Sequence, residues 1–315
     1  MKYSIACGID DNYVQHAAVM LMSLSQNNLN YSFDVYILSL NVCKTSKEKL
    51  ESLFVKSNLK IHFIDINESM LDTFPIRETD YLSIACYLRL FLPVVLPKSV
   101  DKILYLDSDI IVNSCIVDLL DIDIMDYYAA ACLDLDQTNC NRLCYSTKLG
   151  YYNSGVFMFN IAQIRTFDFM DLVLDFINNT STELKYHDQD LLNVLLKGKI
   201  KTLEHKWNML ECYYLDKSKI CKFEDIKRGL EDTKIIHFSS AFKPWSFGCR
   251  HPKKREYFKY LDMIPWGNPK LHKFVSFNKL RIWAKIVILC GGSTVSIDCI
   301  KAFVYKVMSI RKLKK

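Results

Sequence analysis

Apolar residues in the first 112 positions form two kinds of pattern, short runs that are rich in apolar residues and sets at helical spacing. The short runs predict β-strands at 3–9, 33–40, 60–66 and 101–112. Helical spacing predicts α-helices over 14–25, 45–56 and about 80–92. Thr45 is the predicted N-cap of the second helix, because Glu48 follows three residues later, as in a capping box. Strands that alternate with helices predict an α/β fold with a doubly wound, mostly parallel sheet.

The rest of the chain has a more mixed pattern. Strands are expected at 127–134 and 152–160, followed by a last strand and loop at 235–245. Helices are expected at roughly 162–178 and 186–198, the second ending at Gly198 as its C-cap. The Gly/Pro-containing stretch PWGNPK (265–270) predicts a boundary, so that one domain covers 1–269 and a separate tail covers 270–315.

The tail carries the whole positive excess of the chain. It contains 11 Lys or Arg residues and one acid, Asp298, whereas 1–269 contains 30 basic and 34 acidic residues. Over 297–310 four apolar residues share one face of a predicted helix: Ile300, Phe303, Val304 and Val307. Such a basic amphipathic segment is typical of attachment to an anionic membrane surface, and the apolar run at 282–290 is far shorter than the ~20 residues of a membrane span. Packing against the main domain is the alternative, and without a nucleic-acid-binding motif no nucleic-acid partner is expected.

The cysteines and the N-terminus bear on the cellular compartment. The chain has 12 cysteines with no C-x-x-C pair and no metal-ligand spacing, and several lie in apolar segments, where a free thiol behaves as a small hydrophobic group. The apolar stretch at the N-terminus is cut off by Asp10 and Asp11, too early for a signal peptide. These features predict free thiols and a cytoplasmic location, with peripheral attachment to the inner face of the cytoplasmic membrane through the tail.

The segment LYLDSDIIV (104–112) contains the first candidate chemistry. Asp107 and Asp109 interrupt an apolar run, where burying charge is costly unless something compensates it. In an extended strand, residues i and i+2 point to the same face, so the two carboxylates are expected to project together. Their hard oxygens suit Mg²⁺ or Mn²⁺, and the carboxyl end of a strand is where open α/β sheets bind ligands.

Considered alone, this segment leaves three interpretations open. It is a cation clamp, a solvated strand end with two surface acids, or the strand of a haloacid-dehalogenase-like phosphatase with Asp107 as nucleophile. An EF-hand loop is excluded, because Val112 and Asp118 stand where it needs glycine and glutamate.

Five ordered motifs resemble the family-eight retaining glycosyltransferases, the group that contains bacterial lipooligosaccharide galactosyltransferases and glycogenin. The motifs are GIDDNY (8–13), CYLRLFLP (86–93), LYLDSDIIV (104–112), YYNSGVFMFN (151–160) with HDQDLLN (187–193), and HFSSAFKPW (237–245). The resemblance runs from residue 3 to about residue 266. It implies a single GT-A-like fold whose N-terminal half is a Rossmann-like nucleotide-binding region.

The resemblance implies a metal centre and a nucleotide site. Asp107 and Asp109 look like the metal pair of the family and His237 like its third protein ligand, for Mn²⁺ or Mg²⁺. The uridine and the diphosphate are expected at four positions: Gly8, Asp10, Asn12 and Lys243. Without the resemblance, these segments would be interpreted as an Asp/Asn turn, a structural histidine and a solvated lysine.

Four further residues resemble those that hold the donor sugar: Arg89, Asn153, Asp188 and Gln189. An unpaired Arg89 in an apolar helix would be costly, so a core ion pair with Asp107 or Asp109 is expected whether or not a sugar binds. Asp188 is otherwise a helix-start acid favoured by the helix dipole, and 153–155 a simple turn.

The implied reaction is transfer of galactose or glucose from a UDP-sugar to a saccharide or glycolipid acceptor, such as a lipopolysaccharide, with retention of configuration. Gln189 is a poor nucleophile, so we favour same-face attack by the acceptor, with a covalent route through Asp188 as the alternative. Ser239 and Ser240 replace the glycine of the family pattern HF-x-G-x-x-KPW, where side chains would narrow the approach to phosphate or acceptor. A D-x-D phosphohydrolase and a non-catalytic nucleotide-sugar-binding protein are the alternative functions.

Overall fold

The computed structural model describes residues 2–76, 83–215, 224–246 and 248–268. By its internal contacts the chain divides into two compact units, 1–244 with 250–269, and 245–249 with 270–315. The predicted basic tail lies outside the described residues, as does the start of the helix expected from residue 80.

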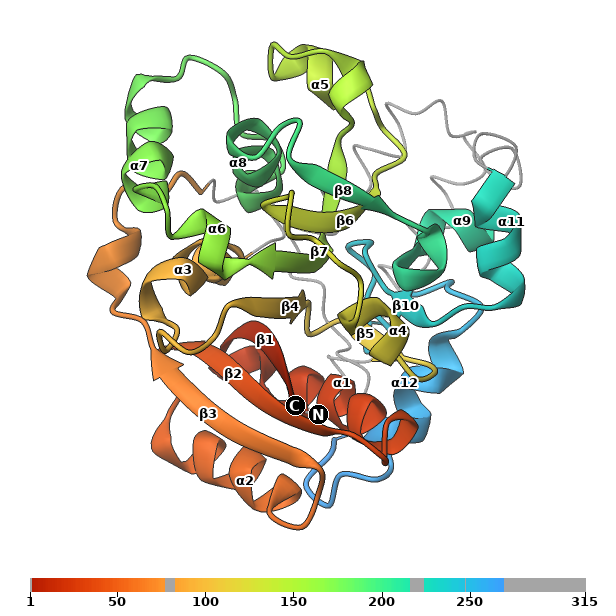
Figure 1. The fold of residues 1–315 in the computed structure, drawn as a ribbon. Helices are drawn as coiled ribbons and strands as arrows, with labels where there is room; N and C mark the ends of the chain where they lie inside the picture. The colour runs from red at the N-terminus through yellow and green to blue at the C-terminus, as the bar shows by residue number, and fades with distance from the viewer. Residues whose placement is uncertain (1, 77–82, 216–223, 247, 269–315) are drawn as a thin grey trace, which may run out of the picture. The chain divides into compact units, whose positions relative to one another are not determined.

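A seven-stranded sheet crosses the first unit in the order β3-β2-β1-β4-β7-β6-β8 (Figure 1). The first four strands in this order are parallel: β3 (Leu59–Asp65), β2 (Ser32–Leu40), β1 (Lys2–Asp10) and β4 (Lys102–Leu106). β7 (Tyr152–Asn160) is antiparallel to both β4 and β6 (Ala129–Leu133), and β8 (Ile200–Leu203) is parallel to β6. The predicted α/β fold with a mostly parallel, mixed sheet is confirmed.

A small second sheet has the order β5-β10-β9, from β5 (Ile110–Val112), β10 (Ile235–His237) and β9 (Met209–Leu210). The prediction of one continuous strand over 101–112 is therefore wrong. Leu106 still pairs with β7, whereas Ile110 pairs with His237 in the small sheet. The chain changes sheets across Asp107, Ser108 and Asp109, because these polar side chains would be costly in the interior of the large sheet.

The helices surround the large sheet in the view of Figure 1. The α-helices are α1 (Val14–Asn27), α2 (Lys44–Phe54), α3 (Leu92–Val95), α4 (Val117–Leu120), α5 (Asn139–Arg142), α6 (Ile161–Ile164), α7 (Phe169–Asn179), α8 (His187–Leu195), α9 (Glu211–Leu215), α11 (Glu224–Glu231) and α12 (Lys254–Leu261). The 3₁₀ helices are η1 (Asp11–Tyr13), η2 (Glu68–Leu71), η3 (Ile84–Phe91), η4 (Thr147–Leu149) and η5 (His205–Trp207). No helix among the described residues is long and apolar enough to cross a bilayer.

Several predicted helix boundaries are wrong. Thr45 is not an N-cap, since α2 already begins at Lys44 and Cys43 precedes it without a side-chain cap bond. The helix predicted over 162–178 is divided into α6 and α7, and the Thr166 hydroxyl donates to the Gln163 carbonyl where α6 ends. α8 ends at Leu195, so Gly198 (φ 74°) lies in the following turn and is not its C-cap.

The helix expected over residues 80–92 is a 3₁₀ helix in its described part. It continues directly into α3, where Pro93 occupies the first turn and needs no hydrogen-bond partner for its nitrogen. Its buried side chains pack with α8 and with alternate residues of the strands, among them Ala6, Leu38 and Phe157, in one core. This packing holds η3 against β1 and α8, and α8 against β7.

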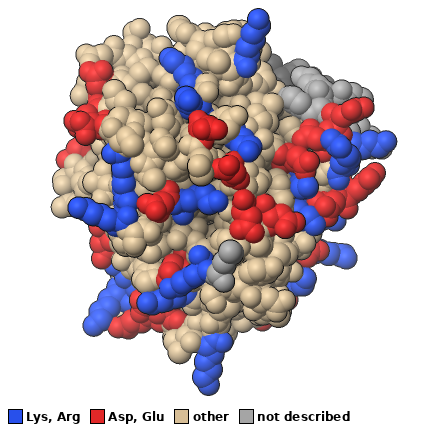
Figure 2. Space-filling model, viewed as in Figure 1, with Lys and Arg blue, Asp and Glu red and all other residues tan. Residues whose placement is uncertain are grey.

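Charged side chains are mixed over the surface seen in Figure 2. Lys and Arg lie among Asp and Glu, with broad uncharged areas between them and no extended area of one sign among the residues drawn in colour. The nine described cysteines are all free thiols.

His251 is a buried group that makes stability depend on pH. Its ring packs against Tyr214 and Phe238, Nδ1 accepts a hydrogen bond from the Lys253 backbone, and Nε2 has no partner among the described residues. Burial, with smaller effects of His237 and Lys253, lowers its pKa from 6.5 to about 4.

Stability is therefore expected to decrease as the pH falls through the window between these two pKa values. The unfolded chain takes up a proton near pH 6.5 while the folded protein resists it until about pH 4, so His251 should lower the free energy of unfolding by about 2 kcal/mol between pH 7 and pH 5. His251→Phe should lose that part of the pH dependence. Urea unfolding of both proteins at the two pH values measures the difference, and equal pH dependence would contradict the assignment.

Candidate metal centre and donor site

The D-x-D segment lies at the junction of the two sheets. The Asp107 backbone N–H donates to the Gly155 carbonyl of β7 (2.9 Å), and the Asp109 carbonyl accepts from the Phe238 N–H just beyond β10 (3.0 Å). The two acids therefore belong to a turn, and the expectation that they project from one extended strand is wrong in its geometry. Their carboxylates nevertheless converge, because each end of the turn is bonded to a different sheet.

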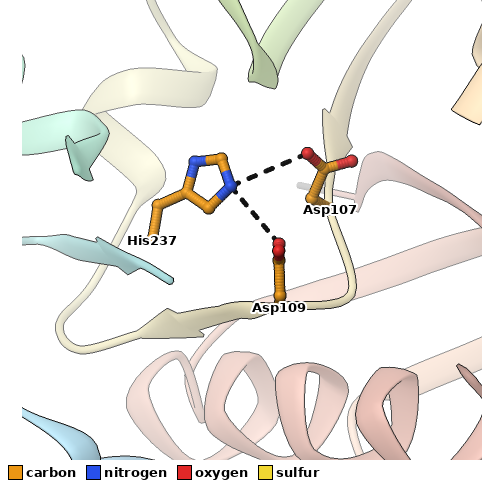
Figure 3. A group of neighbouring side chains, drawn as sticks. All are labelled: Asp107, Asp109 and His237. Carbon is orange, nitrogen blue, oxygen red and sulfur yellow. Dashed lines mark ion pairs between the residues drawn. The ribbon is translucent and has the colours of Figure 1, made fainter. Parts of the chain in front are cut away.

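Asp107, Asp109 and His237 form one cluster, drawn in Figure 3. His237 Nε2 lies 3.3 Å from Asp109 Oδ1 and 3.8 Å from Asp107 Oδ2, and the three ligand atoms lie within 4.8 Å of one another. His237 ends β10, so the small sheet carries the ring to the turn. The structure thus brings together all three residues that the sequence predicted as metal ligands.

The donor set suits a divalent cation. Asp109 Oδ1 and Ser108 Oγ are buried and have no hydrogen-bond partner among the described residues. A buried carboxylate oxygen without a partner is costly, and a bound cation would satisfy it. Two hard carboxylates and one imidazole fit Mn²⁺ or Mg²⁺ better than a soft metal that prefers thiolates.

Lys243 lies beside this cluster. Its ammonium group donates to Asp109 Oδ2 and to the Phe238 carbonyl (2.8 Å). Burial opposes ionisation of Asp109, but Lys243 and then His237 outweigh it and hold the pKa of that carboxyl well below its usual value. Asp109 therefore stays charged throughout the physiological pH range.

Arg89 connects the metal cluster with α8. Its guanidinium group bonds to Asp107 Oδ1 (2.7 Å), Asp188 Oδ2 (3.0 Å) and the Ser154 carbonyl (2.6 Å), and it lies 4.2 Å from the centre of the Tyr105 ring. Burial opposes its charge, but Asp107 and Asp188 keep its pKa above the usual value. The core ion pair expected for Arg89 is present, with Asp107 as one partner.

Five charged side chains around the metal cluster have a formal net charge of −1. Three carboxylates, of Asp107, Asp109 and Asp188, face two cations, Arg89 and Lys243. Burial raises the pKa of Asp188, although Arg89 acts in the opposite direction. A divalent cation would change this balance to one positive charge, which suits an anionic ligand.

The side chains of Asn153, Asp188 and Gln189 meet beside the cluster. Gln189 Oε1 accepts from the Asn153 side-chain amide and from the Ser154 backbone N–H (3.1 Å each), while Asp188 accepts from the Ser154 hydroxyl (3.0 Å). His187, at the start of α8, has a left-handed backbone (φ 48°) that is unusual for a residue with a side chain. This bend precedes the two side chains that enter the site.

Three of the four predicted nucleotide residues, Gly8, Asp10 and Asn12, lie at the end of β1 and in η1, which follows it directly. Asp10 accepts from the Asn12 backbone (2.9 Å) and from the Ser83 hydroxyl (3.1 Å), and Asn12 is exposed. Gly8 donates its N–H to Tyr105 Oη (3.1 Å), and an added Cβ would lie 3.1 Å from Leu88. The element that approaches the Gly8 backbone closely is therefore η3 of the protein itself.

Ser239 and Ser240, which replace the glycine of the family pattern, lie in a local turn. The Ser240 hydroxyl accepts from the Phe242 backbone N–H at 3.2 Å, just before Lys243. The side chain therefore holds the short segment between His237 and Lys243.

Sequence reasoning missed two side chains of the site. Asn208 is fully buried and bonds to both His237 and Asn153, and Asp134 lies 3.4 Å from the side-chain nitrogens of Asn153 and Gln189. Asp134 is the last residue of the strand predicted over 127–134, but nothing in the sequence distinguishes it from an acidic residue that simply ends a strand. Asn208 carries no motif, and only its contacts reveal it.

Gly155 provides the space for the cluster. A Cβ at this position would lie 2.2 Å from His237 Cε1 and 2.7 Å from Asp107 Oδ2, so two of the three ligands would have to move. We expect Gly155→Ala to reduce Mn²⁺ affinity by about 10- to 100-fold, as is typical when the orientation of a metal ligand is disturbed. Isothermal titration with Mn²⁺ measures the loss.

Gly150→Ala is the matched control for Gly155→Ala. Gly150 has a left-handed backbone (φ 75°), so alanine is strained there, but its Cβ would meet Leu133 and Tyr152 and none of the three ligands. It should lower thermal stability while Mn²⁺ affinity stays at the wild-type level. Wild-type affinity in Gly155→Ala would show that the three ligands tolerate the Cβ.

Comparisons with known proteins agree with the class that the fold and the site define, the glycosyltransferases of GT-A type. The solved structure of galactosyltransferase LgtC, in complex with donor and acceptor sugar analogues, superposes with a TM-score of 0.75, covering 84% of this chain and 96% of that chain. At 23% sequence identity this likeness concerns the fold, and it confirms the predicted GT-A-like architecture.

Sequence comparison then gives the family. The model of glycosyl transferase family 8 matches residues 4–249, and the chain belongs to that family. Lipopolysaccharide 1,2-glucosyltransferase of Escherichia coli (strain K12) is 30% identical over 270 residues, 84% of this chain and 78% of the relative. General stress protein A of Bacillus subtilis (strain 168) is 29% identical over 285 residues, 87% of this chain and 98% of the relative. The predicted enzyme class, a hexosyltransferase, is confirmed.

Proposed function

We propose that the protein is a metal-dependent, retaining hexosyltransferase that takes galactose or glucose from a UDP-sugar. The observation that supports this most directly is the cluster of Asp107, Asp109 and His237, which contains a buried carboxylate oxygen without a hydrogen-bond partner among the described residues. Mn²⁺ or Mg²⁺ is the expected ion.

Two cationic side chains would assist departure of the diphosphate. A divalent cation bound by the three ligands would neutralise negative charge on the phosphate oxygens. Lys243 is ion-paired with Asp109, and Arg89 is ion-paired with Asp107. Both positive charges are therefore already oriented beside the cation site. Groups oriented in advance need little reorganisation when charge develops in the transition state.

Same-face attack by the acceptor is the mechanism that we favour for retention. Asp188, the alternative nucleophile, is bonded to Arg89 and to the Ser154 hydroxyl, and these contacts lower its nucleophilicity. Gln189 Oε1 is held by two N–H donors, so its carbonyl dipole has a fixed direction from which to stabilise a positively charged sugar ring.

The proposed acceptor is a saccharide of a surface glycan. A lipopolysaccharide glucosyltransferase among the relatives supports this class of acceptor. Cytoplasmic location and attachment of the tail to the inner membrane surface would bring the enzyme to a lipid-linked acceptor.

Hydrolysis of a panel of UDP-sugars, with Mn²⁺, with Mg²⁺ and with EDTA, tests the proposal. We expect one UDP-hexose to be cleaved in the presence of metal and none in EDTA. UDP should raise the melting temperature only when metal is present, because a ligand that binds the folded state alone stabilises it. The proposal fails if the protein neither binds UDP with Mn²⁺ nor cleaves any UDP-hexose.

The same panel separates the alternatives. Tight UDP-sugar binding without turnover on any acceptor would indicate a nucleotide-sugar-binding protein. Hydrolysis of a simple phosphoester that is lost in Asp107→Asn while UDP binding is kept would indicate a phosphohydrolase.

A further inference from the structure

Asn208 links the predicted metal ligand His237 to the residues of the donor site. It lies between η5 and β9, and its side chain is fully buried. Its Oδ1 lies 2.9 Å from His237 Nδ1, and its Nδ2 donates to Asn153 Oδ1 at 2.8 Å. Asn153 in turn donates to Gln189 Oε1 at 3.1 Å. Four side chains thus form one continuous hydrogen-bonded chain.

Two backbone groups fix the direction of every hydrogen bond in this chain. The Gly155 N–H donates to Asn153 Oδ1, and the Ser154 N–H donates to Gln189 Oε1, each at 3.1 Å. A backbone N–H can only donate, so the Asn153 atom that it meets is an oxygen. The Asn208 atom that meets the same oxygen must then be its NH₂ group, which leaves the Asn208 oxygen facing His237.

The consequence for His237 is a defined tautomer. Because Asn208 presents an acceptor, His237 Nδ1 must carry a proton, and in the neutral ring Nε2 then keeps its lone pair. Nε2 is the atom that lies 3.3 Å from Asp109 Oδ1 and 3.8 Å from Asp107 Oδ2. An unprotonated ring nitrogen is the form that binds a cation, so the amide chain prepares this nitrogen for metal binding.

We propose that Asn208 is a positioning residue that sets the tautomer and ring orientation of His237 and, through Asn153, holds Gln189 in register with the metal centre. This inference rests on the proposed metal dependence. A purely structural role for Asn208, in which it only satisfies buried polar groups, predicts that its loss changes stability but neither the tautomer nor the affinity for metal.

The experiment compares Asn208→Ala and Asn208→Asp with the wild type. Nitrogen-15 NMR of the metal-free protein reports the His237 tautomer, and titration with Mn²⁺ alone reports metal affinity. Asn208→Ala should lose the excess of the Nδ1–H form and bind Mn²⁺ about 10- to 100-fold more weakly. Asn208→Asp keeps an acceptor for the His237 Nδ1–H group, so it should keep the tautomer and the affinity for Mn²⁺. Its second oxygen replaces the NH₂ group and should repel Asn153 Oδ1.

Two further variants make the test specific. Asn160→Ala is the matched control, because Asn160 is also buried and bonded to backbone carbonyls, but at the far end of β7. It should leave both readouts unchanged. In a His237→Ala background, Asn208→Ala should cause no further loss of Mn²⁺ affinity if it acts through the histidine.

The outcomes separate this inference from the proposed function. If the wild type binds Mn²⁺ and Asn208→Ala keeps both the tautomer and the affinity, or if the two substitutions reduce affinity independently, the positioning role is overturned. If the wild type does not bind Mn²⁺, the proposed metal dependence fails, and an unchanged tautomer in Asn208→Ala would overturn the inference separately.

Discussion

Asp109→Asn is expected to abolish metal-dependent transfer, with kcat/KM falling by about 10³-fold or more. The substitution keeps the size of the side chain but removes its charge. The residue is bonded to Lys243, faces His237 at 3.3 Å and contributes a buried oxygen that has no hydrogen-bond partner among the described residues. An amide at this position is a much weaker ligand for Mn²⁺, and it removes the carboxylate that is paired with the buried Lys243. Titration with Mn²⁺ and UDP-hexose hydrolysis measure the two effects.

Asp34→Asn is the control for a lost carboxylate. Asp34 is a partly buried acid on β2 that pairs with Lys2 and His62, and none of the metal ligands is among these partners. Its loss should change stability slightly and leave Mn²⁺ affinity and hydrolysis unaltered. Wild-type metal affinity in Asp109→Asn would remove Asp109 from the ligand set.

Arg89→Ala is expected to lower the free energy of unfolding by about 3–5 kcal/mol, because it removes the cation that is paired with the buried Asp188 and the partly buried Asp107. Arg89 is 4% exposed and bonds to Asp107, Asp188 and the Ser154 carbonyl. Activity should fall by about 10²- to 10³-fold even under conditions where the variant is folded, since Asp107 would no longer be held toward the cation site. Urea unfolding and hydrolysis assays measure the two losses.

Arg89→Lys tests the geometry of the same contact. A lysine keeps the charge but cannot reproduce a planar fork that reaches three partners, so we expect it to recover stability in part and little activity. Arg165→Lys is the matched control, because Arg165 bonds to the backbone carbonyls of Pro93, Leu96 and Val100, and none of its bonds within the described part of the chain reaches a site residue. Arg89→Lys with wild-type activity would show that charge alone is needed there.

The parallel half of the fold could be predicted from the sequence because its pattern is local. Each of β1, β2 and β3 is a short run rich in apolar residues that is followed by a helical pattern or a turn. Strands that are neighbours in the sequence pair with each other here, so their pairing needs no information from distant parts of the chain. The residues of the metal cluster could also be predicted, from the D-x-D segment and from the resemblance that singled out His237. Their roles in catalysis stay predictions until the assays are made.

The features that sequence could not give depend on contacts between distant residues. The break between β4 and β5 arises because Leu106 pairs with β7 and Ile110 with β10, and neither partner can be recognised from the apolar run itself. Asn208 was missed for the same reason, since its partners lie 29 and 55 positions away in the chain. A polar residue becomes informative only when the fold shows what it faces.

The division of the D-x-D strand between two sheets gives the ligand cluster a mechanical role. Asp107 directly follows β4 of the large sheet, whereas Asp109 directly precedes β5 of the small sheet and His237 ends β10. The Gly155 and Phe238 backbone bonds each hold one end of the turn to its own sheet, whereas a cation bound by all three ligands would act as a cross-link between the two sheets. Binding energy at the metal would then resist any shear of one sheet against the other, so donor loading and the rigidity of the whole catalytic scaffold would rise together.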